Sequence, residues 1–334
     1  MAKYHVYGVG NALVDKEFEV EDQFFIENKI EKGVMTLVEH DQQQRLLDEL
    51  TKKYGVRKQT GGGSAGNTLY ALSQFGGEAF YACRVANDDT GDYFLEQMGH
   101  HNIDTNVSQR EEGMSGLCVV MVSPDAERTM HTYLGVSADI SLTDMDFDAA
   151  QDSEYIYIEG YLVTSPPAKK AILELKKFAR DKGIKVAMTF SDPAMLEYFR
   201  DDINEVLDGG VDLLFCNEKE ARLWSGETDT DKACLALQST AKQFVVTRGP
   251  EGALAYDGNE YIAIDGNKVK AVDTNGAGDM FAGAFLYGVT QGWDFARAGQ
   301  LASLASSTLV THYGARLEAK KHAELREQIT GSNG

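Results

Sequence analysis

The stretch "DTNGAGDMFAGAF" at residues 273–285 combines a turn of small residues with the start of an apolar helix. Gly276, Ala277 and Gly278 lie where the backbone amides at a helix N-terminus are exposed, and such amides attract phosphate. The next residue, Asp279, is an acid, which an ordinary phosphate cradle does not need. Two interpretations remain for it: a helix-capping residue, or a carboxylate that faces an attacking hydroxyl group across a bound phosphoryl group.

The chain around this turn alternates strand-like and helix-like segments. The segment 168–183 has apolar residues spaced three and four apart, as in an amphipathic helix. Such alternation is typical of an α/β fold with a mostly parallel sheet. The expected strands are 3–10, 79–86, 153–160, 184–190, 211–217 and 242–249. We expect one domain over residues 1–330 and a disordered tail at 331–334.

Two segments, 12–38 and 113–136, depart from this alternation. Both show strand patterns with no helix between them, which predicts a small antiparallel sheet that projects from the main body. Such a sheet beside the carboxyl ends of parallel strands can act as a lid over a site. Ordinary edge hairpins explain the same pattern, so both interpretations stay open.

Composition excludes several classes of protein. The 334 residues include 52 acids and 32 bases, a formal charge of −20, which disfavours binding to nucleic acid. No apolar run reaches the length of a membrane span, and the first residues do not resemble a signal peptide, so we expect no membrane partner and a cytoplasmic location. The four cysteines form no CxxC pair, which argues against a disulfide framework or a thiolate zinc site.

Two glycine-rich stretches lie in the N-terminal part. "GVGNAL" at 8–13 resembles the start of a dinucleotide fingerprint but lacks its third glycine. "GGGSAGNT" at 61–68 resembles a phosphate-binding loop in which Asn67 replaces the lysine. Gly62 and Gly63 allow close backbone approach, and the amide of Asn67 both donates and accepts, which suits polyol hydroxyls. A plain flexible loop before a helix is the alternative.

Two further stretches follow expected strands. In "NEKE" at 217–220, Asn217 and Glu220 share one face of a helical turn and can hold the waters of a Mg²⁺ ion. A helix N-terminus with acidic residues is the alternative. In "TRGPEGAL" at 247–254, the hydroxyl, the arginine and the glycines can meet a nucleotide's phosphates, although a hairpin explains the glycines equally well.

Together these stretches resemble the PfkB, or ribokinase-like, family of carbohydrate and nucleoside kinases. "DTNGAGD" is similar to its C-terminal signature and "GGGSAGNTLYALSQFGG" to its N-terminal one, with "NEKE" and "TRGPEG" at the expected intervals. The resemblance implies a Rossmann-like, mostly parallel sheet with helices on both faces and a small β-sheet lid. It also implies ATP as the phosphoryl donor, Mg²⁺, and often a monovalent cation such as K⁺ that promotes activity.

The resemblance implies a role for each matching residue. Asp279 would be the catalytic base, and Gly276, Ala277 and Gly278 the anion hole. Asn217 and Glu220 would organise Mg²⁺ through water. ATP would be bound by Thr247, Gly249, Gly252 and Thr274. The acceptor would be bound by Asn11, Asp15, Gly62, Gly63, Asn67 and Tyr161, and also by Arg128, for which a solvated surface arginine is the alternative.

Within the family the N-terminal third is similar to the adenosine kinase branch, as in "GVGNALVD" and "GYLVTSPP". That branch tends to have paired aromatic residues where this chain has Tyr161 and Leu162. Phosphorylation of adenosine to AMP is the leading interpretation, and a free-sugar kinase acting on ribose or fructose is the alternative. An NAD-dependent oxidoreductase and a non-catalytic sugar-binding protein are remoter alternatives. A monomer and a homodimer remain equally open.

Overall fold

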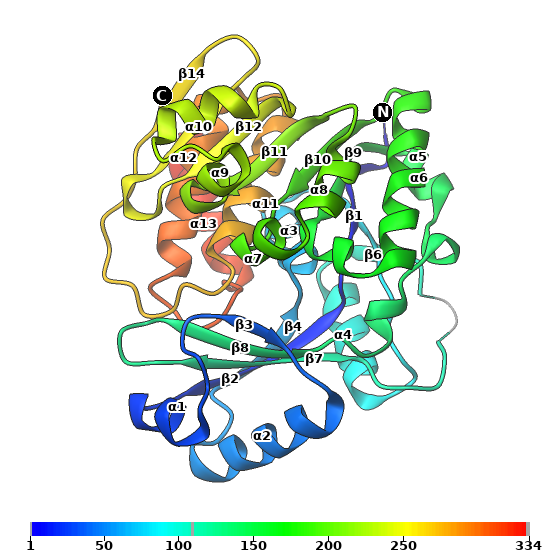
Figure 1. Ribbon diagram of the computed structural model, residues 1–334. Helices are drawn as coiled ribbons and strands as arrows, with labels where there is room; N and C mark the ends of the chain where they lie inside the picture. The colour runs from blue at the N-terminus through cyan, green and yellow to red at the C-terminus, as the bar shows by residue number, and fades with distance from the viewer. Residues whose placement is uncertain (1, 108–109, 332–334) are drawn as a thin grey trace.

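The computed structural model describes residues 2–107 and 110–331, which form a large sheet and a small one (Figure 1). Within these residues the large sheet has nine strands, in the order β14-β13-β12-β11-β10-β9-β1-β5-β6. Their bounds are β1 Tyr4–Val9, β5 Ala79–Ala82, β6 Ile103–Thr105, β9 Ser153–Glu159, β10 Lys185–Thr189, β11 Val211–Asn217, β12 Ala241–Thr247, β13 Ala253–Tyr256 and β14 Tyr261–Ile264. All six expected strands are confirmed. The pairing is parallel from β6 to β12 and antiparallel at β13 and β14.

Helices cover both faces of the large sheet, as expected. Side chains alternate between the faces, so Tyr157 and Phe215 enter one apolar core while Ile156 and Leu214 enter the other. The first core is covered by α3 Ser64–Gln74, α4 Asp89–His100, α11 Ala277–Thr290, α12 Phe295–Leu309 and α13 Ala319–Gly331. The second is covered by α5 Phe147–Gln151, α6 Pro166–Lys182, α7 Pro193–Tyr198, α8 Arg200–Leu207, α9 Glu218–Ser225 and α10 Thr230–Leu237.

The small sheet has the order β3-β8-β7-β2-β4 within the described residues. Its bounds are β2 Leu13–Glu19, β3 Met35–Leu37, β4 Lys58–Gly62, β7 Gly116–Val122 and β8 Arg128–Tyr133. The prediction of an antiparallel sheet is wrong, because β2 pairs with β7, and β3 with β8, in parallel. The sheet is therefore mixed, with antiparallel pairing only at β2–β4 and β7–β8 among the described strands.

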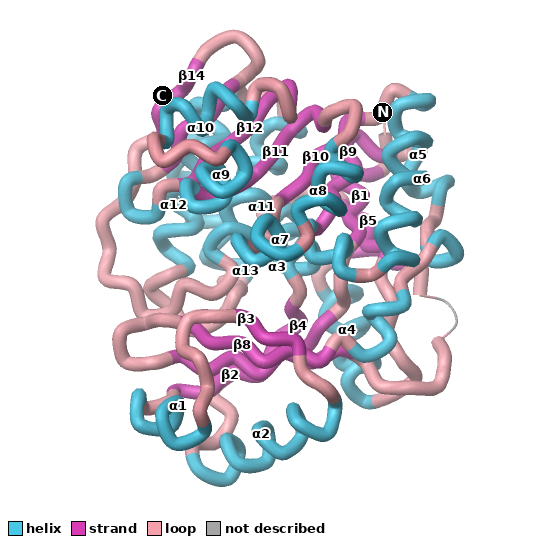
Figure 2. Tube along the Cα trace, in the orientation of Figure 1, coloured by secondary structure: helices cyan, strands magenta, loops and turns pink. Residues whose placement is uncertain are grey.

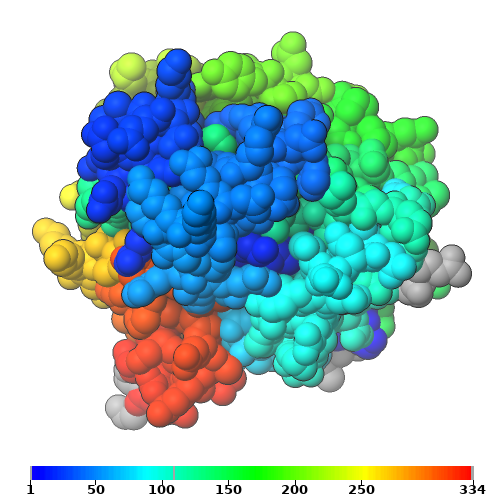
Figure 3. Space-filling view, turned by 90° about the horizontal axis from the view of Figure 1, so that it is seen from below, coloured from blue at the N-terminus to red at the C-terminus, as the bar shows by residue number. Residues whose placement is uncertain are grey.

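Two helices cover the outer face of the small sheet (Figures 1 and 2). They are α1 Asp22–Asn28, which lies inside the segment 12–38 where no helix was expected, and α2 His40–Lys53. Phe24 and Leu50 of these helices pack against Phe18 and Val119 of the sheet. Seen from below, the atoms of this layer cover much of the molecule's surface (Figure 3). The small sheet thus carries an apolar core of its own.

The remaining elements are short. Four 3₁₀ turns occur within the described chain, at Gly135–Asp139, Leu142–Asp144, Gly160–Thr164 and Gly249–Glu251. Gly331 belongs to α13 rather than to the tail predicted for 331–334, whose other residues lie outside the described part. In residues 2–107 and 110–331 no helix combines the length and the apolar character that a membrane crossing requires.

The helices α3 and α11 pack unusually closely against each other. A Cβ atom on Gly283 of α11 would lie 2.3 Å from the backbone oxygen of Thr68 in α3. Because a backbone atom cannot move away as a flexible side chain does, only glycine fits there. This contact brings the first turns of the two helices together.

We therefore expect the substitution Gly283→Ala to lower the free energy of unfolding by about 1–3 kcal/mol, the range of overpacked cores. Urea denaturation of the purified protein measures this change. Gly99→Ala is the control, since a Cβ at this helical position would have no neighbour within 4 Å. Alanine there should preserve or slightly raise stability. Equal stability of the wild type and Gly283→Ala would contradict the close packing.

Candidate active site

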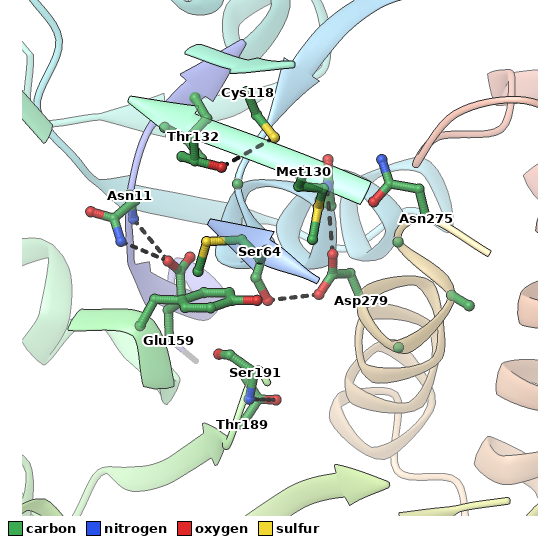
Figure 4. A pocket seen from close by; sticks show the side chains of 18 of the residues that line it. Asn11, Ser64, Cys118, Met130, Thr132, Glu159, Thr189, Ser191, Asn275 and Asp279 are labelled. Carbon is green, nitrogen blue, oxygen red and sulfur yellow. Dashed lines mark hydrogen bonds between the residues drawn. The ribbon is translucent and has the colours of Figure 1, made fainter. Parts of the chain in front are cut away.

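A cavity of about 280 Å³ lies between the two sheets, and most of the predicted site residues line it (Figure 4). The predicted residues on its wall are Asn11, Asp15, Gly63, Asn67, Arg128, Tyr161, Asn217, Glu220, Thr247, Thr274, Gly276, Ala277, Gly278 and Asp279. Gly62, Gly249 and Gly252 are outside the set of lining residues. The fold therefore brings together the two glycine-rich stretches and the ends of β9, β11 and β12.

The turn at the start of α11 has the geometry of an anion-binding site. Gly276 is the N-cap residue, with φ of 70°, and a Cβ atom on it would lie 2.6 Å from the Cβ of Ala315. Glycine is thus required there for both conformation and space. Gly278, by contrast, faces open space, because its Cβ would meet nothing within 4 Å. The backbone amides of the first helical turn can therefore be approached by an anion.

Asp279 is the third residue of α11 and does not cap the helix, so its carboxylate has another role. Ser64 donates a hydrogen bond of 2.7 Å to its Oδ1, and Nδ2 of Asn67 lies 3.4 Å from its Oδ2. Burial raises the pKa of Asp279 to about 6, and the bond from Ser64 opposes this rise. Asp279 is thus a carboxylate of near-neutral pKa beside a helix N-terminus. Ser64 was not predicted, although it lies inside "GGGSAGNT".

Asp15 lies on β2 of the small sheet and lines the cavity. Burial raises its pKa to about 7, and the positive charge of Arg316 opposes this rise. A Cβ atom on Gly62 would lie 2.1 Å from Oδ1 of Asp15. Gly62 therefore leaves room for the Asp15 carboxylate. The carboxylate lines the cavity, whereas Gly62 itself does not.

Glu159 is a buried carboxylate on the cavity wall that the sequence analysis missed. It accepts hydrogen bonds from the backbone amide of Ala65 (2.8 Å) and from Nδ2 of Asn11 (3.0 Å). The other end of the Asn11 amide accepts from Ser137 Oγ at 3.1 Å. Asn11 thus holds the loop after β1 in place. A polar residue at the carboxyl end of the apolar strand "YIYIE" was the available signal for Glu159.

Asn217 and Glu220 form a reciprocal cap at the start of α9. Asn217 Oδ1 accepts from the backbone amide of Glu220, and Glu220 accepts from the backbone amide and Nδ2 of Asn217, at 2.8–2.9 Å. Burial raises the pKa of Glu220 to about 7. The "NEKE" stretch therefore forms a helix N-terminus with acidic residues, which was the alternative interpretation. The buried carboxylate of Glu220 nevertheless lies on the cavity wall.

The chemistry of these donors fits a hydrated Mg²⁺ ion better than one held directly by protein. No three His, Cys, Asp or Glu side chains converge on a metal site in residues 2–107 and 110–331. Glu220 retains carboxylate lone pairs beyond its capping bonds, so it can accept from a metal-bound water. Thr247 ends β12 at the same wall, whereas Gly249 and Gly252 lie in the turn to β13, as a hairpin requires.

Arg128 connects the small sheet to the turn before α11. Its Nη1 donates to Oδ1 of Asn275 at 3.0 Å, and the side chain is only partly exposed. A freely solvated surface arginine, the alternative considered for it, is therefore excluded. Tyr161 lies in the 3₁₀ turn after β9, where burial raises the pKa of its hydroxyl group.

The small sheet gives the cavity an apolar wall that the sequence did not predict. The side chains on this wall are Leu13, Met35, Leu37, Cys118, Met130 and Leu134. Thr132 is the neighbouring polar residue, and it donates to the sulfur of Cys118. The cavity is consequently polar beside Asp15 and Asp279 and apolar under the small sheet.

Comparison with known proteins is consistent with this geometry. The sequence matches the profile of the pfkB family carbohydrate kinases over residues 34–322. A structure of an adenosine kinase from Sinorhizobium meliloti has a TM-score of 0.91 and 32% identity, and the match covers 97% of this chain and 99% of that one. A probable sugar kinase from Rhizobium etli has a TM-score of 0.90 and 33% identity, with 97% and 100% covered. A 5-dehydro-2-deoxygluconokinase from Clostridium perfringens is 27% identical and covers 80% of this chain and 83% of its own. The predicted ribokinase-like fold is confirmed, while the named relatives differ in substrate.

The raised pKa values predict a pH dependence of turnover. Asp15 and Asp279 bind protons at higher pH than ordinary carboxyls, so we expect kcat/KM to fall as the pH drops through about 7 to 6.

Ser64→Ala removes a bond that favours the ionised form of Asp279, so this fall at acidic pH, the acid limb of the profile, should move to higher pH. Rates of ATP-dependent turnover between pH 5 and 9 measure both effects. Ser307→Ala, whose hydroxyl bonds only to a helix carbonyl within the described contacts, is the control. Identical limbs in wild type and Ser64→Ala would contradict the role of Ser64.

Proposed function

Because the chain belongs to the pfkB family of carbohydrate kinases, whose members phosphorylate hydroxyl groups of sugars or nucleosides, we propose that it phosphorylates the 5′-hydroxyl of adenosine to give AMP. The donor in this proposal is ATP with Mg²⁺. The observation that carries the choice of a nucleoside is the apolar wall of the cavity next to Asp15. A purine needs an apolar slot beside the groups that bind ribose, whereas a free sugar is polar on all sides.

The ribose hydroxyls in this proposal meet Asp15 and Asn67. A carboxylate accepts two hydroxyl protons, and an amide both donates and accepts, so the pair suits a vicinal diol. The base lies under Met35, Leu37 and Met130, and Tyr161 offers the cavity an aromatic ring. The 32% identity to the Sinorhizobium adenosine kinase supports the same acceptor.

Asp279 takes the proton of the attacking hydroxyl group as the phosphorus–oxygen bond forms. Because the transition state of phosphoryl transfer is loose, the proton leaves late, and a base with a pKa near 6 is sufficient. The amides at the start of α11 stabilise the charge that spreads over the phosphoryl oxygens. Mg²⁺, which Glu220 would reach through water, would neutralise the negative charge of the nucleotide's phosphates.

The small sheet excludes water from the transfer in this proposal. Water is a competing acceptor, so the bond from Arg128 to Asn275 favours transfer by holding the sheet against the α11 turn. We further propose that the protein works as a monomer in the cytoplasm. The monomer is supported by the outer face of the small sheet, which α1 and α2 already cover, so that this face has no need of a second subunit.

A free-sugar kinase is the second candidate, and the Clostridium 5-dehydro-2-deoxygluconokinase supports it. The polar half of the cavity, with Asp15, Asn67 and Asp279, would serve such an acceptor equally well. The apolar half would then have no ligand surface to contact. An NAD-dependent oxidoreductase would not explain the anion-binding turn at the start of α11. A non-catalytic sugar-binding protein would not explain a base at Asp279.

We expect adenosine to be phosphorylated with the highest kcat/KM in a panel of adenosine, inosine, guanosine, ribose and fructose. The apolar wall should favour a purine nucleoside over free sugars by roughly 10-fold or more, because each buried group contributes about 1–3 kcal/mol. Coupled detection of ADP release with ATP and Mg²⁺ measures the rates. A preference for ribose or fructose would refute the base slot and leave the phosphoryl-transfer groups in place.

Asp279→Asn should lower kcat by about 10²–10⁴-fold, the usual contribution of a general base. The amide is isosteric and still accepts from Ser64, so adenosine binding measured by calorimetry should change much less. Turnover within a few-fold of wild type would remove Asp279 from the mechanism. Asp229→Asn, at the N-cap of α10 and away from the cavity, is the matched control.

A further inference from the structure

Arg316 is a charged side chain buried beside the cavity, and no carboxylate of residues 2–107 or 110–331 forms an ion pair with it. It lies between α12 and α13 and is only 6% exposed. Its Nε donates to Oδ1 of Asn67 at 2.9 Å, while Nη1 and Nη2 have no hydrogen-bond partner among the described residues. Burying a guanidinium in this way costs stability. Such a cost is often tolerated where the charge acts on a functional site.

The chain holds Arg316 in one position. Its guanidinium carbon lies 4.7 Å from the centre of the Tyr70 ring, and a Cβ atom on Gly61 would approach Nη1 to 2.8 Å. Lys58 donates to the backbone oxygen of Arg316 at 3.2 Å and to that of Tyr313 at 2.7 Å. Both the backbone and the side chain are therefore fixed relative to β4 and α3.

We propose that Arg316 is a positioning residue that turns the amide nitrogen of Asn67 toward Asp279 and places a positive charge within electrostatic reach of Asp15. The proposal rests on the phosphoryl transfer at Asp279 described above. An amide has one accepting end and one donating end, so occupation of Oδ1 by Arg316 leaves Nδ2 for Asp279. If Asn67 turned over, its oxygen would face the Asp279 carboxylate, and the two acceptors would repel each other.

The charge of Arg316 also acts on both carboxyls of the cavity. It opposes the effect of burial and lowers the pKa of Asp15 and of Asp279. Removing the charge should therefore raise both pKa values. The titratable groups within its electrostatic reach include Asp15 on β2, Tyr70 on α3, Tyr81 on β5, Tyr93 on α4, His101 after α4 and Asp279 on α11, and the ammonium of Lys58 on β4 lies against its backbone oxygen. Of these, Asp15 and Asp279 line the cavity.

Two substitutions separate the two effects. Arg316→Gln can still donate to Asn67 but carries no charge, whereas Arg316→Met keeps only an apolar stem. For Arg316→Gln we expect the acid limb of kcat/KM to move to higher pH with a small change in kcat at pH 9. For Arg316→Met we expect the same shift and, in addition, a fall in kcat/KM of roughly 10-fold or more at every pH, as for a buried partner left unpaired.

The variants are compared on whichever of adenosine, ribose and fructose the wild type phosphorylates with the highest kcat/KM. A wild type that prefers ribose would refute adenosine as the acceptor and leave the Arg316 comparison intact. Arg297→Met is the matched control, since Arg297 of α12 stacks on Trp293, which precedes that helix, at 4.2 Å and does not line the cavity. Its pH profile should equal that of the wild type.

A second measurement does not depend on any acceptor. The attraction between Arg316 and the carboxylates exists only when the carboxylates are ionised. The Tm of the wild type minus the Tm of Arg316→Gln should therefore increase from pH 5 to pH 8. The difference for Arg297→Met should stay constant over this range. An unchanged acid limb, or a Tm difference independent of pH, would overturn the proposal and leave Arg316 with a purely structural role.

Discussion

The hydrogen bonds between the first turns of α3 and α11 are the constraint on which the site depends. Ser64 and Asn67 bond to Asp279, and they can do so because Gly283 allows the two helices to approach to contact. Both helices begin at the edge where the parallel strands end. Asp279 is thereby fixed relative to the amides of its own turn and to the groups on β2, so one packing contact aligns acceptor, base and anion hole.

Local patterns account for what the sequence predicted. Strands such as β5 are continuous apolar runs because both of their faces are buried, and the α11 turn is recognisable because its small residues are adjacent. The direction of pairing between β2 and β7 depends on contacts between distant segments, which no local pattern records. The helix α1 was missed because its paired Phe24 and Phe25 resemble a short strand.

Two of the unpredicted site residues share one property. Glu159 and Arg316 are single charged residues in otherwise ordinary segments, and each acts only through contacts with distant parts of the chain. Asn67 was predicted from its own loop, yet its orientation depends on Arg316. Sequence patterns therefore identified most residues at the centre of the site, whereas the contacts that hold them, such as the bond from Arg316 to Asn67, became visible only in three dimensions.

The helices beneath the small sheet affect how that sheet can move. Phe18, Phe24 and Leu50 give this layer an apolar core of its own. The chain passes between the layers near Gly10, Gly63, Gly113 and Gly135, at the ends of strands rather than within them. Opening of the layer would therefore turn it about these few points and would break the bonds of Lys58 and Arg128 to the main body. The amides of β2 and β7 would stay protected from hydrogen exchange through every catalytic cycle, and only the connecting residues would exchange rapidly.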